Sequence, residues 1–214
     1  MDLSYGAEAE AYRTQVRGFL KSTWKPGDRR KDELKAYLRE FRRSATEAGY
    51  LYRGVPKRYG GSEQPVDVIK AQVIREEFQR ARAPMEVGGN GMNMVVPTLL
   101  ERGTDAQRER FIRGTVDGDF VWGQGYSEPG SGSDLASVRT KGERDGDDWV
   151  INGQKIWTSF GALADYCYLI CRTTTEGPPH AGISEIIVPM DTPGIEVRPI
   201  KDMTTNRHFC EVFF

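Results

Sequence analysis

The sequence predicts an α+β fold, in which an N-terminal all-α helical domain (residues 1–118) is followed by an antiparallel β-barrel or β-sandwich domain (residues 119–214). Hydrophobic residues recur with helical spacing up to Asp117, and with the spacing of strands and tight turns after it. The charge balance changes at the same place. Residues 1–118 carry 22 Lys and Arg against 17 Asp and Glu, whereas residues 119–214 carry 8 against 14. No low-complexity linker separates the two halves.

Five helices are expected in the first half, each from apolar residues that recur three or four positions apart. The second is the clearest, since Leu34, Leu38 and Phe41 share this spacing. Gly49 follows it as a stop signal, and Thr104 begins a cap signal for the fifth helix. The expected helices cover residues 7–20, 34–45, 66–78, 85–100 and 105–112.

Strands joined by tight turns are expected in the second half. Asp145-Gly146 and Asn152-Gly153 are dipeptides that two-residue hairpin turns favour, because these turns require positive φ angles. Pro193-Gly194 supplies another turn. Closely spaced strands without intervening helices predict an antiparallel arrangement. Strands flank the two hairpin turns, and further strands are expected at residues 166–171, 183–188, 195–200 and 209–214.

Composition excludes several classes of protein. A chain of 214 residues buries roughly 70% of its unfolded surface, so it needs no disulfide or metal for stability. No apolar run approaches the roughly 20 residues of a membrane span. The N-terminus, MDLSYGAEAEAYR, lacks the features of a signal or transit peptide, which favours a cytoplasmic location. The basic cluster at residues 28–33 is flanked by carboxylates, so it indicates a solvated helix start and not a nucleic-acid surface.

The cysteines and histidines do not form a metal-binding pattern. Cys167, Cys171 and Cys210 lack a zinc spacing, and we interpret them as small buried hydrophobic residues, with ligands or redox thiols as the alternative. His180 and His208 lie far apart in the sequence and suggest neither a metal pair nor a charge relay. We therefore expect no metal site.

The glycine- and serine-rich stretch GQGYSEPGSGSDLAS, residues 123–137, follows an apolar run. A P-loop would end in Gly-Lys-Ser/Thr, and no lysine is present here. A dinucleotide-binding fingerprint would need its third glycine at the right spacing and a helix directly after the loop. Here the spacing fails, and residues 136–141 resemble a strand. The stretch taken alone is therefore interpreted as a corner of the β domain.

Two motifs change this interpretation. Residues 126–134, YSEPGSGSD, resemble the signature of the acyl-CoA dehydrogenase flavoproteins. About twenty-five residues downstream, NGQKIWTS at residues 152–159 resembles the second flavin motif of that family. Similarity extends over nearly all of the chain in the family's order, at residues 55–61, 97–100, 107–111 and 191–195.

The resemblance implies that the protein binds FAD. Residues Gln124 to Ser127 would line the pyrimidine side of the flavin ring, Trp157 would pack against it, and Thr158 and Ser159 would reach its N5 and O4 edge. Ser133 would contact the acyl-CoA ligand and close the cofactor loop. Without the neighbouring motif, Trp157 would be interpreted as a core aromatic at a strand end. The implied cofactor-binding residues are Gln124, Gly125, Tyr126, Ser127, Gly132, Ser133, Trp157, Thr158 and Ser159.

The resemblance also implies a reaction and partners. FAD-dependent α,β-dehydrogenation would convert an acyl-CoA thioester to the trans-2-enoyl-CoA, and a carrier, the electron-transfer flavoprotein, would take the electrons. The family forms homo- or hetero-oligomers, so a tetramer or dimer is expected. Its catalytic base is a glutamate in a C-terminal helical bundle, which this sequence does not include. We therefore assign no catalytic residue, and we interpret Glu128 as a structural member of the loop.

Several alternatives remain open from the sequence. The chain ends in an apolar strand, Glu211-Val-Phe-Phe214, which predicts a truncated sequence or a fold completed by another chain. The protein would then be an incomplete dehydrogenase or a non-catalytic, flavin-binding partner subunit. Acyl-CoA oxidases and flavin monooxygenases share this fold, and the two motifs separate them incompletely from dehydrogenases.

Overall fold

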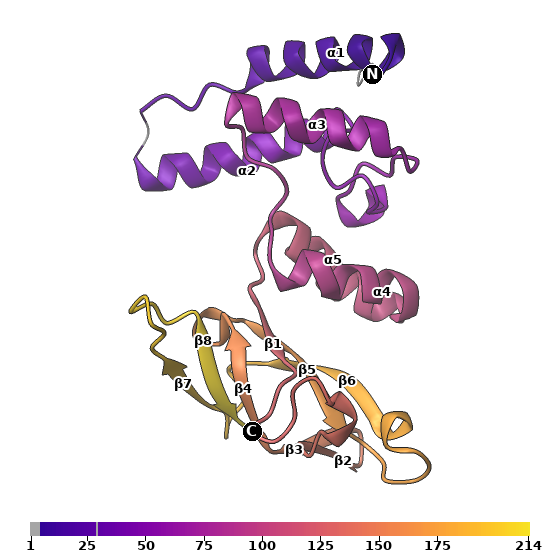
Figure 1. The fold of residues 1–214 in the computed structure, drawn as a ribbon, viewed down its shortest axis with the longest axis vertical. Coiled ribbons are helices and arrows are strands. Elements are labelled where there is room, and N and C mark those ends of the chain that lie inside the picture. The colour runs from indigo at the N-terminus through magenta and orange to yellow at the C-terminus, as the bar shows by residue number, and fades with distance from the viewer. Residues whose placement is uncertain (1–4, 29) are drawn as a thin grey trace. The chain divides into compact units, whose positions relative to one another are not determined.

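The computed structural model describes residues 5–28 and 30–214. Residues 1–4 of the N-terminal segment and Arg29 of the basic cluster lie outside the described residues. Helices come first along the chain and strands follow, so the predicted fold class is confirmed (Figure 1). Among the described residues, no helix is both long enough and apolar enough to cross a membrane.

Residue contacts divide the chain into two compact units. The first contains the chain up to Val87 together with Arg102–Asp117, and the second contains Gly88–Glu101 together with Gly118–Phe214. The boundary predicted near residue 118 is a single cut along the sequence. By its contacts, however, the segment Gly88–Glu101 belongs with the strands.

The first unit is built from helices whose apolar faces meet. Val16, Phe41 and Phe78 are buried, and the rings of Phe41 and Phe78 lie 6.1 Å apart. Trp24 packs on Phe41 at 4.9 Å between ring centroids, which adds aromatic contact to the buried apolar area. These helices are α1 (Ala7–Thr23), α2 (Lys31–Glu47), α3 (Val68–Ala81) and α5 (Asp105–Asp117). As expected, α2 begins within the basic cluster.

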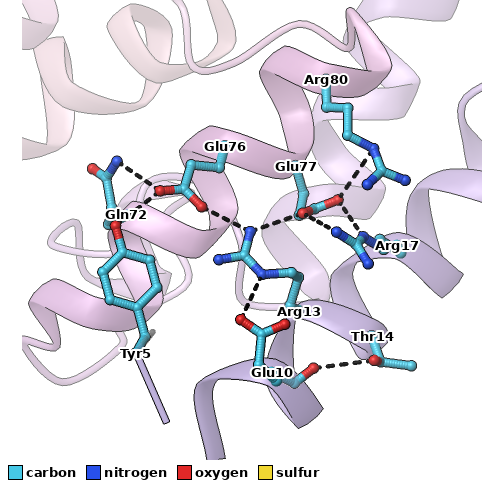
Figure 2. A network of polar contacts seen from close by, with 9 residues as sticks. All are labelled: Tyr5, Glu10, Arg13, Thr14, Arg17, Gln72, Glu76, Glu77 and Arg80. Atoms are coloured by element: carbon cyan, nitrogen blue, oxygen red, sulfur yellow. Dashed lines mark hydrogen bonds and ion pairs between the residues drawn. The ribbon is translucent and has the colours of Figure 1, made fainter. Parts of the chain in front are cut away.

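A buried carboxylate joins α1 to α3. Glu77 is 3% exposed and accepts hydrogen bonds from Arg13 (2.9 Å) and from Arg17 (2.7 and 3.0 Å), as Figure 2 shows. Arg13 also contacts Glu76 at 2.7 Å. Burial raises the pKa of Glu77, but the hydrogen bonds from Arg17 and Arg13 outweigh it and hold that pKa below its usual range. Glu77 is therefore ionised at neutral pH and links the two helices.

The fourth predicted helix, at residues 85–100, starts later than expected. Gly88 and Gly89 precede it, and Gly89 has a φ of +104°, which an α-helix does not allow. The helical segment begins with a wide π-type turn at Gly91–Val95 and continues as α4 (Val96–Arg102). Apolar periodicity extended the prediction too far because it does not register the two glycines as a break.

The second unit contains two sheets that form a sandwich and not a closed barrel. The strand order is β1-β5-β2-β3 in the first sheet, with β6 paired to β5, and β4-β8-β7 in the second. The strands are β1 (Trp122–Gly125), β2 (Lys141–Asp145), β3 (Asp148–Asn152), β4 (Gln154–Ser159), β5 (Tyr166–Arg172), β6 (Ile183–Pro189), β7 (Glu196–Ile200) and β8 (Phe209–Phe213).

The first sheet is mixed, whereas the sequence predicted antiparallel strands. β1 pairs with β5 in parallel, from Trp122 opposite Tyr166 to Gly125 opposite Leu169. β2 also meets β5 in parallel, at Lys141 opposite Arg172. The chain passes through β2, β3 and β4 between β1 and β5. β1 and β5 are therefore neighbours in the sheet but not in the sequence.

The cysteines lie in the core of the β unit. Cys167, Cys171 and Cys210 are fully buried and free, and Cys167 and Cys171 pack with Leu169 and Val188. Alternation along β5 places these two cysteines and Leu169 on one face. The interpretation of the cysteines as buried hydrophobic residues is confirmed.

The strands predicted at residues 166–171, 183–188, 195–200 and 209–214 and one hairpin turn were confirmed, whereas one turn prediction and one strand prediction were wrong. Asp145-Gly146 forms the β2–β3 hairpin, with Gly146 at φ +62°. Asn152-Gly153 forms no hairpin, because there the chain leaves β3 for the second sheet. A Cβ on Gly153 would lie 2.4 Å from Thr140 Oγ1, so close packing accounts for this glycine. Residues 136–141 do not begin as a strand: Leu135–Ser137 is a 3-10 turn that precedes β2.

Candidate cofactor and substrate site

An ion pair inside the β unit anchors the glycine- and serine-rich loop. Lys155 Nζ lies 2.9 Å from Glu128 Oε1 and also donates to the carbonyl oxygen of Tyr126 at 2.9 Å. The Lys155 side chain is 0% exposed and that of Glu128 is 7% exposed. The carboxylate also accepts the main-chain N–H groups of Arg139 and Thr140, each at 2.8 Å. Glu128 therefore ties together both ends of the loop.

The protonation states suit this structural role. Burial raises the pKa of Glu128, but hydrogen bonds from Thr140, Arg139 and Lys155 outweigh it and hold that pKa below its usual range. Burial lowers the pKa of Lys155, and the neighbouring Glu128 opposes this shift. The interpretation of Glu128 as a structural member of the loop is confirmed. Lys155 lies within the second motif, but no function was predicted for it from the sequence.

The loop also has internal hydrogen bonds and a direct link to β4. Glu128 and Ser131 exchange main-chain hydrogen bonds of 2.7 and 3.1 Å, and Ser131 Oγ donates to the carbonyl oxygen of Asp134 at 2.8 Å. The N–H of Ile156 donates to the carbonyl oxygen of Ser127 at 2.9 Å. This bond holds Ser127 beside the second motif, at Ile156, the residue that precedes Trp157 in the chain.

Arg172, at the end of β5, holds the far side of the loop. Its guanidinium donates to the carbonyl oxygens of Ala136 (2.6 Å), Val138 (3.0 Å) and Pro179 (2.9 Å). Within the described part of the chain it has no carboxylate partner. Sequence reasoning missed Arg172, because nothing in either motif marks a β5 residue as a partner of the loop.

The second motif leaves Trp157 exposed at an irregular point of β4. The pairing of β4 with β8 is irregular between Lys155 and Thr158, and Trp157 has a left-handed φ of +60° there. Trp157 is 55% exposed, and its ring meets that of Phe209 edge to face at 6.2 Å. Ser159 is half-buried. Trp157 thus offers a large aromatic surface beside the loop.

Thr158 departs from the expectation that it would reach the flavin edge. Its side chain is 0% exposed, and its hydroxyl has no hydrogen-bond partner in the described residues. Its methyl group lies against Gly123 and Gly161. Thr158 is buried, whereas Trp157 is exposed and Ser159 is half-buried, at the irregular part of the pairing of β4 with β8. Of the two residues predicted to reach the ring, only Ser159 is not fully buried.

The first motif begins at the end of β1. A Cβ on Gly125 would lie 2.7 Å from Cys167 Sγ, so packing requires a glycine there. Gln124 is half-buried and paired opposite Tyr168. The other two predicted positions, Gly132 and Ser133, are exposed near the tip of the loop.

The Tyr126 side chain is fixed by a carboxylate. Its hydroxyl donates to Glu185 Oε1 at 2.8 Å, and Tyr168 donates to Glu185 Oε2 at 2.5 Å. Burial and then Glu185 raise the pKa of Tyr126 far above its usual range, and the same causes raise the pKa of Tyr168 to about 12. Both tyrosines are therefore neutral hydrogen-bond donors at physiological pH.

Two family models cover almost the whole chain. Residues 6–119 match the model described as acyl-CoA dehydrogenase, N-terminal domain. Residues 123–214 match the model described as acyl-CoA dehydrogenase, middle domain. The chain belongs to the acyl-CoA dehydrogenase family. The resemblance inferred from its two motifs is confirmed.

Individual relatives agree with this assignment. The chain is 40% identical to the acyl-CoA dehydrogenase IpdE1 of Mycobacterium tuberculosis over 97% of this chain and 56% of the relative. The ChsE4-ChsE5 complex from Mycobacterium tuberculosis matches with a TM-score of 0.72 and 35% identity, over 100% of this chain and 54% of that one. The Tcur3481-Tcur3483 steroid ACAD matches with a TM-score of 0.72 and 37% identity, over 100% and 56%. The chain therefore spans about half the length of these relatives.

The groups at the site suit FAD, which the acyl-CoA dehydrogenase family generally binds. A flavin ring needs an aromatic or apolar surface and neutral hydrogen-bond donors along its polar edge. Trp157 supplies the surface. The hydroxyls of Ser127, Ser133 and Ser159 have no partner within residues 5–28 and 30–214, so they are available to a ligand.

Proposed function

We propose that this chain supplies the flavin- and acyl-CoA-binding part of an enzyme that oxidises an acyl-CoA thioester to the trans-2-enoyl-CoA. The electrons pass to a carrier, the electron-transfer flavoprotein. One observation supports this most: the Lys155–Glu128 pair and the Ile156–Ser127 hydrogen bond hold the first motif against the second. The cytoplasmic location stays a prediction from the sequence.

Each predicted site residue except the buried Thr158 has a role in this proposal. Bound FAD supplies the acceptor for the hydride that leaves the β carbon. The main chain of residues 124–127 and the Ser127 hydroxyl hold the pyrimidine side of the ring, and Trp157 packs against it. The Ser159 hydroxyl stabilises negative charge at the ring edge. Ser133, at the exposed tip of the loop, orients the acyl-CoA, and Gly132 allows close approach of the main chain there.

The base that removes the α proton is proposed to lie elsewhere in the complete enzyme. Glu128, the acidic residue most firmly built into the first motif, is engaged by Lys155 and by two main-chain N–H groups. A carboxylate held this way and kept ionised by its donors serves poorly as a mobile base. The base would belong to a further part of the same polypeptide or to a partner subunit.

A non-catalytic partner subunit is the second candidate function. Two of the similar structures are named for two components each, ChsE4-ChsE5 and Tcur3481-Tcur3483. In a hetero-oligomer of this kind, the present chain would contribute flavin contacts, and a different subunit would contribute the base. A homo-oligomer, dimeric or tetrameric, is the arrangement proposed for the complete dehydrogenase.

The deciding experiment combines native mass spectrometry with anaerobic flavin reduction, on protein isolated from its natural source. A single polypeptide with FAD that acyl-CoA bleaches supports a complete dehydrogenase. FAD found only with a second, different polypeptide supports the partner-subunit role. Steroid acyl-CoA thioesters belong among the test substrates, because one similar protein is a steroid ACAD. Protein without flavin, or flavin that no acyl-CoA reduces, would refute the proposed reaction.

Oxygen reactivity separates the dehydrogenase from the oxidase and monooxygenase alternatives. After reduction, admitting air should leave a dehydrogenase reduced for minutes, whereas added electron-transfer flavoprotein should reoxidise it. Rapid reoxidation by oxygen with release of hydrogen peroxide would instead indicate an oxidase. Incorporation of oxygen into a product would indicate a monooxygenase.

A further inference from the structure

The first unit contains a cavity lined by basic side chains that the proposed dehydrogenation does not use. Its volume is about 680 Å³. α2 contributes Arg39, Arg42 and Arg43, α5 contributes Arg113, and the turn after Val55 contributes Lys57. All of these residues belong to the first compact unit. The positive charge of the N-terminal half is thus gathered in part around one hollow.

Positive charge exceeds negative charge around this cavity. Five basic side chains line it, and Glu47 and Asp117 are its two carboxylates, which leaves an excess of three positive charges. One of the carboxylates is already paired, since Arg113 Nε lies 2.8 Å from Asp117 Oδ2. A concave surface with an excess of one sign of charge attracts ions of the opposite sign.

Several of the arginines are held in place by other contacts. Arg42 Nε donates to the carbonyl oxygen of Met85 at 2.9 Å, and Arg43 pairs with Glu40 at 2.8 Å. Each of these contacts uses part of a guanidinium that has five N–H donors. Lys57 differs from them, because its ammonium group has no partner within residues 5–28 and 30–214.

The turn that carries Lys57 has a tightly defined main chain. Gly60 has a φ of +90°, and a Cβ there would lie 3.0 Å from Cδ of Arg113. A Cβ on Gly61 would lie 2.0 Å from the carbonyl oxygen of Val55. These two glycines let the turn fold back on itself and let Arg113 lie across it. Lys57 and Arg113 both line the cavity.

We infer that this cavity binds a small molecule carrying two or more phosphate groups. Guanidinium groups match phosphate oxygens with paired hydrogen bonds, and an ammonium group adds a point charge. The cavity volume lies in the usual range of small-molecule sites, roughly 300–1,000 Å³. The five basic residues line one hollow, which favours a small polyanion over an acidic polypeptide. The site lies in the first unit, so it is separate from the flavin-binding residues.

Isothermal titration calorimetry with inorganic pyrophosphate tests this inference, on the protein with the flavin and subunits that it carries when purified. Saturable binding should weaken by roughly tenfold in Lys57→Gln, which removes one charge-assisted contact. It should weaken further in Arg43→Gln/Lys57→Gln. Lys21→Gln is the matched control, since Lys21 is an exposed lysine of the same unit that does not line the cavity. Thermal unfolding checks that each variant is folded.

The outcomes separate this site from the proposed dehydrogenase. Flavin content should be the same in all variants, so loss of pyrophosphate binding with unchanged FAD supports an independent site. Equal affinities in Lys57→Gln and Lys21→Gln would overturn the inference, as would the absence of saturable binding. Binding of an acidic peptide without binding of pyrophosphate would also overturn it, in favour of a polypeptide ligand.

Discussion

Lys155 Nζ and Glu128 Oε1 lie 2.9 Å apart, with both side chains almost fully removed from solvent. This pair connects the first motif of the site to the second. A buried ion pair is costly to break, because removing one partner leaves an uncompensated charge in a medium of low polarity. The two motifs are therefore physically coupled, and disrupting either side of the pair should affect both.

Breaking the pair should destabilise the β unit. Lys155→Met leaves the Glu128 carboxylate without its cation, and we expect the free energy of unfolding to fall by about 3–5 kcal/mol. The double variant Glu128→Gln/Lys155→Met removes both charges and should recover part of that loss. Urea denaturation measures both, with Arg198→Gln at an exposed ion pair as a control that changes little. If Lys155→Met were as stable as the Arg198→Gln control, this prediction would be contradicted.

The Trp157 ring and its main-chain conformation can be tested separately. Trp157→Ala and Trp157→Gly both remove the aromatic surface, so both should lose FAD during purification. At a φ of +60°, however, glycine relieves main-chain strain and alanine does not. The flavin-free Trp157→Gly protein should therefore be about 1 kcal/mol more stable than flavin-free Trp157→Ala. Normal flavin content in both variants would exclude Trp157 from the cofactor site.

Substitutions of the neighbouring residues Thr158 and Ser159 should have different effects on FAD affinity. The Thr158 hydroxyl is buried without a partner, so Thr158→Val should leave FAD affinity unchanged and keep or raise stability, by up to about 1 kcal/mol. Ser159→Ala should raise the FAD dissociation constant, by roughly tenfold, with little change in stability. Fluorescence titration of the flavin-free protein with FAD measures both. A larger loss of affinity in Thr158→Val than in Ser159→Ala would reverse the assignment.

Local signals predicted more of this structure than long-range ones. The Asp145-Gly146 hairpin followed from two adjacent residues, and the two motifs identified the family. The parallel pairing of β1 with β5 joins segments about forty residues apart, and no local pattern specifies it. Asn152-Gly153 misled the prediction for the same reason, since packing against Thr140 and a change of sheet decide its conformation.

The candidate site shows the same division between local and long-range information. Its residue types could be read from the motifs, but their orientations could not. The irregular pairing of β4 with β8 and the left-handed conformation of Trp157 decide which side chains face outward. Arg172 contacts the loop from a strand more than thirty residues away, so a motif confined to residues 126–134 carries no information about it.

Arg172 should control the order of the loop. Its guanidinium holds the carbonyl oxygens of Ala136 and Val138, so Arg172→Gln should free this side of the loop while β5 keeps its strand pairing. We expect main-chain amides at residues 131–140 to exchange with deuterium roughly tenfold faster, as after the loss of a charge-assisted hydrogen bond. Hydrogen–deuterium exchange with mass spectrometry measures this, and Arg198→Gln serves as the control. Unchanged exchange would show that the Glu128 contacts alone fix the loop.

Acid should weaken the link between α1 and α3 through Glu77. The pKa of this carboxyl is held below its usual range in the folded protein, so folding favours its ionised form. The stabilisation is present above the unfolded-state pKa, about 4.3, and is lost as the pH falls through the lower folded-state value. Wild-type stability should therefore decline below about pH 4 more steeply than that of Glu77→Gln, which has no carboxyl to protonate. Urea denaturation at a series of pH values measures both slopes. Glu40→Gln, at an exposed ion pair on α2, is the matched control and should keep the wild-type slope. Parallel slopes for wild type and Glu77→Gln would show that the two arginines do not hold Glu77 ionised.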